Sequence, residues 1–341
     1  MEIKAATLIK KNLVRVLKLK IPRLKNSEVL VKVCYSSICH TQIQEILGLR
    51  GKDKFLPHCL GHEATGIVKN KGSNVKKVKI NDKVCLTWVQ SKGLKTSGIQ
   101  YLNKDNKKIN AGPVNTFSSY AIVAENKVIK LPKKNNLKRD VLMGCAIPTA
   151  FNAVFNTLKH TKKDNIIIFG TGGLGLACIF AAKIAGFKKI YALDKTYKKL
   201  LVAKKFGANN IIKVRNSLSK VELKKYKNFF QNGIECTGNL NLMKDSIEMI
   251  KNFGGKLVIV GNYPANLKVK LDPWHFIMGK IVLGAWIDKF NYEDNFLDFY
   301  RKIKQFKWKK YFGSKIYTLN NINLAISDFK KGKVIRPLIK M

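Results

Sequence analysis

Residues 165–175 read NIIIFGTGGLG, a mostly apolar run followed by a glycine-rich turn. The run is typical of a buried β-strand, and the apolar pattern of residues 174–185 predicts a helix directly after the glycines. Gly170, Gly172 and Gly175 form G-x-G-x-x-G between that strand and that helix. There the first glycine allows the tight turn, the second lets backbone approach a pyrophosphate, and the third allows close helix packing. The stretch predicts a dinucleotide-binding unit with phosphates at the helix N-terminus.

The chain after this turn keeps alternating strand and helix patterns. Further strands are predicted at residues 189–193, 210–214, 233–236, 257–260 and 281–284, with a second helix at 197–206. Alternation of this kind gives a doubly wound parallel sheet with helices on both faces, which is an α/β architecture.

Asp194 ends the second of these strands, 19 positions after Gly175 (194 − 175). An acid in this place is expected to bind the adenosine ribose hydroxyls, and it repels a 2′-phosphate, so NAD is favoured over NADP. Lys195 and Lys198 lie nearby and leave NADP open as the alternative.

The first 146 residues have a different pattern. Short strands are predicted at residues 29–34, 65–68, 82–87 and 117–123, separated by glycine and asparagine, which indicates a β-rich, barrel-like domain. A chain of 341 residues exceeds the size at which one core usually stops growing, so two domains are expected. Beyond Trp286 the pattern predicts amphipathic helices near residues 295–305 and 321–329.

Composition limits the compartment and the partners. The net charge of +44 would attract anionic partners, but only seven of the 65 cationic residues are arginine and the lysines occur in every segment. No nucleic-acid-binding module is recognisable, so we expect no specific nucleic-acid partner. The longest apolar runs, such as 165–170 and 257–261, are too short to span a bilayer, and residues 1–8 lack a signal-peptide core. Seven cysteines without a disulfide framework favour the cytoplasm.

Three further stretches carry metal-binding chemistry. They are Ile38-Cys39-His40-Thr41, Leu60-Gly61-His62-Glu63 and Met143-Gly144-Cys145. Two thiols and one imidazole are the ligand set of a catalytic zinc that keeps one position open, and with the dinucleotide fingerprint they indicate redox chemistry at a carbinol or carbonyl carbon. The remaining thiols are assigned to packing and the remaining histidines to no metal; these are Cys34, Cys59, Cys85, Cys178 and Cys236, and His58, His160 and His275.

These stretches, in this order with the glycine motif, resemble the zinc-dependent medium-chain alcohol dehydrogenases, from near residue 1 to Arg336. The resemblance implies a GroES-like, zinc-binding catalytic domain over residues 1–146 and an NAD(P)-binding Rossmann domain over 147–286. It also implies that residues 287–341 return to the catalytic domain. By the same resemblance Cys39, His62 and Cys145 bind one zinc ion per chain.

The resemblance also assigns roles to single residues. Thr41 would receive the alcohol proton, Glu63 would approach zinc during ligand exchange, and His40 would contact the coenzyme pyrophosphate. Further coenzyme contacts are implied at Thr149, Gly170, Gly172, Gly173, Leu174, Gly175, Asp194, Lys199 and Arg336. The implied substrate pocket comprises Trp88, Ala111, Gly112, Asn262 and Trp286, with Arg50, Lys52 and Lys54 near its mouth.

The chain departs from many relatives in three places. There is no cysteine between Cys85 and Cys145, so the four-cysteine lobe that holds a structural zinc is missing. Gln42 replaces an aspartate that accepts a hydrogen bond from the zinc histidine. A glutamine carbonyl can accept the same bond without adding charge, so zinc is expected to be held less tightly. Gln44 replaces the histidine that ends the proton relay, so the last proton must leave through water, His40 or another path.

These observations predict a zinc-dependent, NAD(P)-linked alcohol dehydrogenase that acts on a polar alcohol, such as a polyol or a sugar derivative, and its carbonyl product. A simple primary alcohol is the other substrate class considered. The alternative functions are a zinc-free oxidoreductase like the quinone reductases, and a non-catalytic nucleotide- or nucleic-acid-binding protein on the same fold. By analogy with the family we expect a homodimer or a tetramer, with no membrane partner.

Overall fold

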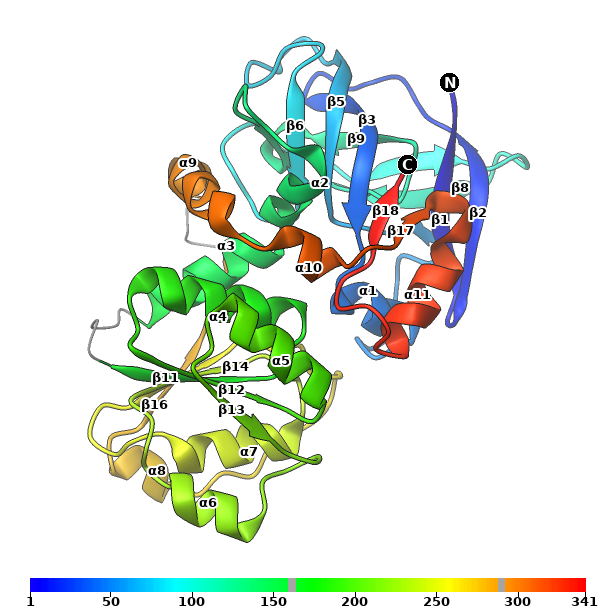
Figure 1. Cartoon of the computed structure of the whole chain (residues 1–341). Coiled ribbons are helices and arrows are strands. Elements are labelled where there is room, and N and C mark those ends of the chain that lie inside the picture. The colour runs from blue at the N-terminus through cyan, green and yellow to red at the C-terminus, as the bar shows by residue number, and fades with distance from the viewer. Residues whose placement is uncertain (159–163, 288–291) are drawn as a thin grey trace. The chain divides into compact units, whose positions relative to one another are not determined.

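The computed structural model describes residues 1–158, 164–287 and 292–341. The chain divides into two compact units (Figure 1). The first comprises Met1–Cys145, Asp288–Tyr300 and Trp308–Met341, and the second comprises Ala146–Ile287 and Arg301–Lys307. A β-rich barrel in one unit and a parallel sheet in the other confirm the predicted α/β class.

The second unit is built on a six-stranded sheet in which every neighbouring pair is parallel. The strand order is β13-β12-β11-β14-β15-β16. The strands are β11 (Asn165–Phe169), β12 (Lys189–Asp194), β13 (Asn210–Lys213), β14 (Asn232–Glu235), β15 (Lys256–Ile259) and β16 (Ile281–Gly284). The order reverses beside β11, and such a switch point is where open α/β sheets bind ligands, outside the carboxyl ends of the strands.

Helices cover both faces of this sheet (Figure 1). They are α3 (Ala146–Phe151), which continues as a π-helical turn (Asn152–Thr157), α4 (Gly173–Ala185), α5 (Tyr197–Phe206), α6 (Lys220–Tyr226), α7 (Leu240–Met249) and α8 (Trp274–Ile277). Residues 301–307 also pack here, because the ring of Phe306 meets those of Phe180 and Phe206 edge to face. The apolar residues of β11 are fully buried, as their sequence predicts.

The glycines of the predicted turn differ in what surrounds them. Gly170 has a φ of +87°, which glycine adopts without strain. A Cβ at Gly175 would lie 1.9 Å from the Gly170 carbonyl oxygen, so only glycine lets α4 start against β11. A Cβ at Gly172 would meet no protein atom within 4 Å, so this side of the turn is open to a ligand.

The first unit combines a barrel with a second sheet. The barrel has the order β1-β2-β7-β8-β4 and the sheet the order β10-β6-β5-β3-β18-β17, with β9 also paired to β3. The strands are β1 (Glu2–Lys10), β2 (Leu13–Lys20), β3 (Glu28–Ser37), β4 (His58–Cys59), β5 (Glu63–Lys71), β6 (Lys83–Thr87), β7 (Ile99–Leu102), β8 (Lys108–Gly112), β9 (Tyr120–Ala124), β10 (Val128–Lys130), β17 (Ile316–Thr318) and β18 (Leu338–Lys340).

Short helices complete the first unit. They are α1 (His40–Ile46), α2 (Leu137–Asp140), α10 (Trp308–Phe312) and α11 (Ile322–Lys330), with 3-10 turns at Glu125–Lys127, Val141–Gly144 and Leu319–Asn321. Helix α9 (Tyr292–Lys302) belongs to this unit up to Tyr300, and its end and the 3-10 turn Ile303–Gln305 belong to the second unit. One apolar core joins α1 and α11 to the first strands through Leu8, Ile43 and Ile322. The last strand, β18, pairs antiparallel with β3, which places the end of the chain in the first unit's sheet. Among the described helices none is long and apolar enough to cross a membrane.

The crowding at Gly175 gives a stability prediction. Gly175→Ala should lower the free energy of unfolding by about 1–3 kcal/mol, because the new methyl group must push α4 away from the Gly170 carbonyl. Gly172→Ala is the matched control and should unfold at nearly the wild-type denaturant concentration, because its methyl group meets nothing. Chemical denaturation followed by circular dichroism measures both. Equal stabilities of the two variants would contradict the packing argument.

Candidate active site

Cys39, His62 and Cys145 come together in the first unit although the sequence separates them widely. Cys39 precedes α1, His62 precedes β5, and Cys145 follows the 3-10 turn Val141–Gly144. Their ligand atoms all lie within 4.8 Å of one another. The absence of a side chain at Gly144 lets the chain before Cys145 pass close to β5 and β6. A Cβ at this position would lie 2.6 Å from the Leu86 carbonyl oxygen and 2.7 Å from the Glu63 Cβ.

The chemistry of this cluster fits a zinc ion. The Nε2 atom of His62 is buried and has no hydrogen-bond partner, which is costly for an imidazole that binds nothing there. A hydrogen bond from the Cys145 thiol holds the pKa of Cys39 well below its ordinary value, while the same contact and burial raise the pKa of Cys145. Two cysteine sulfurs and an imidazole nitrogen form an N/S donor set of the kind that zinc prefers. Across the described ranges no other group of three potential ligands is found.

Glu63 lies directly beside the cluster in a fully buried ion pair. Its Oε1 accepts from the Ser37 hydroxyl at 2.6 Å and from Arg336 Nε at 3.1 Å, and the Arg336 Nη2 donates to the same oxygen. Its Oε2 is buried without a partner. Burial raises the pKa of Glu63 and the Arg336 charge opposes that rise.

Arg336, implied by the resemblance as a pyrophosphate contact, is only 3% exposed and is held by Glu63. The role of Ser37 was not predicted, because nothing in the sequence places it beside a residue 26 positions away.

Two predicted residues lie at the start of α1. The Thr41 hydroxyl oxygen lies 3.7 Å from the Cys39 sulfur, next to the metal ligands. His40 is exposed, and its ring meets that of Phe329 edge to face at 6.3 Å. Gln44, further along the helix, is buried.

A cavity of about 680 Å³ in the first unit includes Gln42 and His62 in its wall. Ala111 and Gly112, two of the predicted pocket residues, line it. Trp88 is not among the residues that line this cavity. Asn262 and Trp286 belong to the second unit, and Trp286 is 69% exposed.

The wall of this cavity carries more positive than negative charge. Arg50, Lys52 and Lys54 line it, as do Glu45 and Asp53. Each acid has a basic neighbour in the same wall: Glu45 pairs with Arg50 at 3.1 Å, and Asp53 contacts His58 at 2.9 Å. The other ring nitrogen of His58 lies 3.0 Å from the Cys59 carbonyl oxygen. Among the described residues Lys52 and Lys54 have no acidic partner.

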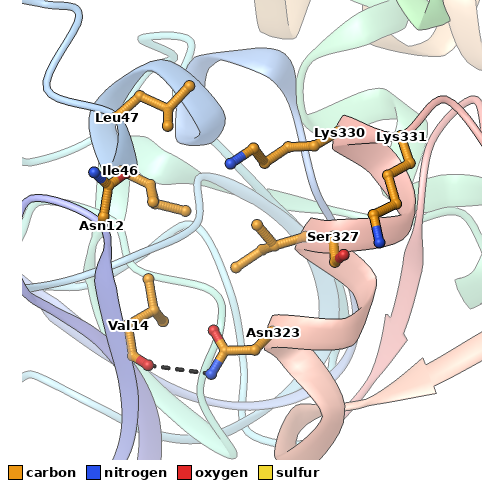
Figure 2. Close-up of a pocket in the computed structure, with 9 residues that line it drawn as sticks. Asn12, Val14, Ile46, Leu47, Asn323, Ser327, Lys330 and Lys331 are labelled. Atoms are coloured by element: carbon orange, nitrogen blue, oxygen red, sulfur yellow. Dashed lines mark hydrogen bonds between the residues drawn. The ribbon is translucent and has the colours of Figure 1, made fainter.

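A second cavity, of about 730 Å³, opens between α1 and α11 (Figure 2). Apolar side chains, two asparagines and two lysines line it; they are Asn12, Val14, Ile46, Leu47, Asn323, Ile326, Ser327, Lys330 and Lys331. The Asn323 amide donates to the Val14 carbonyl oxygen at 3.2 Å. No predicted site residue lines this cavity.

The coenzyme residues of the glycine motif, and Thr149 and Lys199 that the resemblance implied, lie in the second unit. Gly173 and Leu174 begin α4, Lys199 is half-buried on α5, and Thr149 is half-buried on α3. Asp194 fastens the glycine turn: its Oδ2 accepts from the Thr171 backbone N–H at 2.8 Å and from the Thr171 hydroxyl at 3.0 Å. Its Oδ1 accepts from the Thr196 N–H at 2.8 Å. This structural role was not predicted.

The other cysteines and histidines lie outside the cluster. Cys59, Cys85 and Cys178 are buried, whereas Cys34 and Cys236 are partly exposed, and all seven thiols are free. The sulfurs of Cys178 and Cys236 lie 3.9 Å apart. His275 contacts Glu248 at 3.1 Å, and His160 lies outside the described residues.

Comparison with known proteins shows which family the chain resembles. Residues 25–133 match the model of the alcohol dehydrogenase GroES-like domain, and residues 173–302 match that of the zinc-binding dehydrogenase domain. A probable S-(hydroxymethyl)glutathione dehydrogenase 1 of Schizosaccharomyces pombe is 29% identical over 93% of this chain and 91% of its own length. The class-3 alcohol dehydrogenase of Drosophila melanogaster is 27% identical with the same coverage. The structure of benzyl alcohol dehydrogenase from Acinetobacter calcoaceticus matches with a TM-score of 0.87 at 25% identity, over 100% of this chain and 99% of that one.

The chain belongs to the zinc-dependent medium-chain alcohol dehydrogenase family, as its motifs predicted. It is therefore an oxidoreductase that acts on CH–OH donors, and the family implies zinc and NAD(P) as its cofactors.

The single cluster of ligands gives a prediction of metal content. Purified protein should contain close to one zinc ion per chain, and Cys145→Ala should lose that zinc and its turnover while remaining folded. Cys85→Ala removes a buried thiol outside the cluster and should retain the metal. Elemental analysis with circular dichroism measures these properties. A stoichiometry near two would reveal a second site.

Proposed function

We propose that this chain interconverts a polar alcohol and its aldehyde or ketone, with Cys39, His62 and Cys145 holding a catalytic zinc. The observation that carries the proposal is the convergence of these three side chains, with the His62 Nε2 buried and unpaired. A zinc-free oxidoreductase would have no use for such a cluster. Bound zinc would act as a Lewis acid on the substrate oxygen.

Residues around the three ligands have separate roles in proton transfer, metal contact and coenzyme binding. The Thr41 hydroxyl takes the alcohol proton, and it is the hydroxyl found beside the Cys39 sulfur. Glu63 offers the unpaired Oε2 to the cluster while Arg336 and Ser37 hold its other oxygen. His40, exposed at the start of α1, contacts an anionic group of the coenzyme.

The glycine turn supports coenzyme binding with NAD preferred. Gly172 leaves the N-terminus of α4 open, where backbone N–H groups favour a phosphate. Asp194 is at the end of β12, and among the described residues its Oδ1 accepts only the Thr196 N–H, so this oxygen can accept a further bond from a ribose hydroxyl. The carboxylate also repels a 2′-phosphate.

The cavity beside His62 supports a polar substrate. Its wall carries Arg50, Lys52, Lys54 and the Asn110 amide, which suit hydroxyl, carboxylate or phosphate groups better than a purely apolar chain. An apolar wall would favour a simple primary alcohol instead.

A panel of carbonyl compounds assayed with NADH tests the proposed function. We expect turnover to require zinc and to be faster with polyol- or sugar-derived carbonyls than with simple aldehydes of the same length. Faster turnover of the simple aldehydes would contradict the substrate class. Absence of turnover with every compound by a zinc-loaded protein would contradict the function.

Thr41 provides a prediction about the proton path. Thr41→Ala should slow alcohol oxidation by a factor on the order of 10²–10⁴, because the first proton acceptor is lost. Thr41→Ser keeps the hydroxyl and should retain most of the activity. The rate of NADH formation measures both, and near-normal oxidation by Thr41→Ala would show that the proton leaves by another route.

Asp194 provides a prediction about coenzyme choice. The wild-type protein should prefer NAD, and Asp194→Asn should narrow the preference, because the amide has the same shape but no charge to repel a 2′-phosphate. The asparagine oxygen can still accept from the Thr171 N–H, which preserves the turn. The ratio of kcat/KM for the two coenzymes is the readout. Wild-type protein that uses NADP equally well would contradict the assignment.

An exposed sheet edge supports a homodimer. Within the described part of the chain, strand β16 pairs with β15 alone, and large apolar side chains are exposed on and before it, with Trp274 60% and Ile277 67% exposed. Edges and patches of this kind are usually covered by another chain. Sedimentation velocity should show a dimer, and Ile281→Lys should favour the monomer. A wild-type monomer would contradict this part of the proposal.

The seven free thiols support a reducing, cytoplasmic compartment.

A further inference from the structure

The Gln42 side chain lies between two of the proposed zinc ligands. Its Oε1 accepts from the Cys39 backbone N–H at 3.1 Å, and its Nε2 lies 2.5 Å from His62 Nδ1. The first bond is part of a capping box that starts α1. Gln42 is 1% exposed.

Once a metal binds, the Cys39 N–H and the His62 Nδ1 both need a hydrogen-bond acceptor from this amide. A neutral imidazole that ligates through Nε2 carries its proton on Nδ1, so His62 would then be a donor toward Gln42. The Cys39 backbone N–H is always a donor. An amide has one acceptor end and one donor end, so it can accept from one of these groups and must turn its NH₂ toward the other. The Cys39 N–H and the His62 Nδ1 lie at opposite ends of the amide, so one oxygen cannot accept from both, whichever way the amide points.

We propose that Gln42 is a positioning residue that favours the Nε2–H tautomer of His62 and so weakens metal binding. The inference rests on the proposed zinc set. In the metal-free protein the amide satisfies both neighbours: it accepts from Cys39 and donates to Nδ1, which leaves the His62 proton on Nε2. Metal binding moves that proton to Nδ1, and the amide must then give up one bond. The hydrogen bond from the Cys39 N–H to Gln42 belongs to the capping box of α1, so losing it on metal binding would affect the start of this helix.

A carboxylate of the same length removes the conflict. Gln42→Glu presents two acceptor oxygens, one for the Cys39 N–H and one for the His62 Nδ1–H. It should therefore tighten zinc binding by about 10–100-fold, the range found for groups that orient ligating histidines. Gln44→Glu is the charge control, because it adds a carboxylate at another buried position of the same helix.

The first readout needs neither metal nor mutation. In ¹⁵N-labelled, metal-free wild-type protein, at a pH where the ring is neutral, two-bond ¹H–¹⁵N correlations should show His62 as the Nε2–H tautomer. The chain has five histidines, so the signals can be assigned by substitution. Gln42→Glu should convert His62 to the Nδ1–H tautomer, and Gln44→Glu should not. An Nδ1–H tautomer in the wild type would overturn the proposal.

The second readout is zinc affinity by competition with a chromophoric chelator. We expect Gln42→Glu to bind zinc at least tenfold more tightly than the wild type, and Gln44→Glu to bind within about threefold of it. Equal affinities of wild type and Gln42→Glu, or equal tightening by Gln44→Glu, would overturn the proposal while the zinc set stands. If none of the three folded proteins binds zinc, the zinc set and this inference both fail.

Discussion

The buried ion pair between Arg336 and Glu63 is the interaction on which the rest of the site depends. It joins the segment before β18 to the first residue of β5, beside His62, and Ser37 at the end of β3 holds the same carboxylate oxygen. Removing one partner of a buried pair leaves an uncompensated charge and typically costs about 3–5 kcal/mol. The pair therefore connects the end of the chain to the three proposed zinc ligands. One Glu63 oxygen accepts hydrogen bonds from Arg336 and Ser37, and the other has no hydrogen-bond partner.

Acidic residues are few in this chain, and two of the buried ones accept hydrogen bonds that hold backbone segments in place. The chain has 21 acidic residues against 65 basic ones. Glu125 accepts from the backbone N–H groups of Lys76, Lys77 and Leu94, and these bonds lower its pKa although burial opposes the change. Asp194 fastens the glycine turn in the same manner. Lysines, by contrast, are mostly exposed.

Local sequence patterns predicted the helices and strands, but they did not predict side-chain contacts between residues far apart in the sequence. Apolar residues 165–169 and the following glycines predicted β11 and α4, because strand burial and turn geometry are local properties. The three proposed ligands were identified by their residue types and their order. The Ser37 contact, the fastening of Thr171 by Asp194 and the direction of the Gln42 amide depend on tertiary contacts that no spacing encodes. Trp88 was placed by analogy alone, and it does not line the first unit's cavity.

The central claim is that Cys39, His62 and Cys145 together hold a zinc ion, and zinc K-edge X-ray absorption of the purified protein tests it most directly. The account predicts a shell of two sulfur ligands at about 2.3 Å and one imidazole nitrogen at about 2.0–2.1 Å, with a light atom in the fourth position. In Cys145→Ala the sulfur count should fall to one in any zinc that remains bound. A shell of four sulfurs, or one of oxygen and nitrogen alone, would contradict the account.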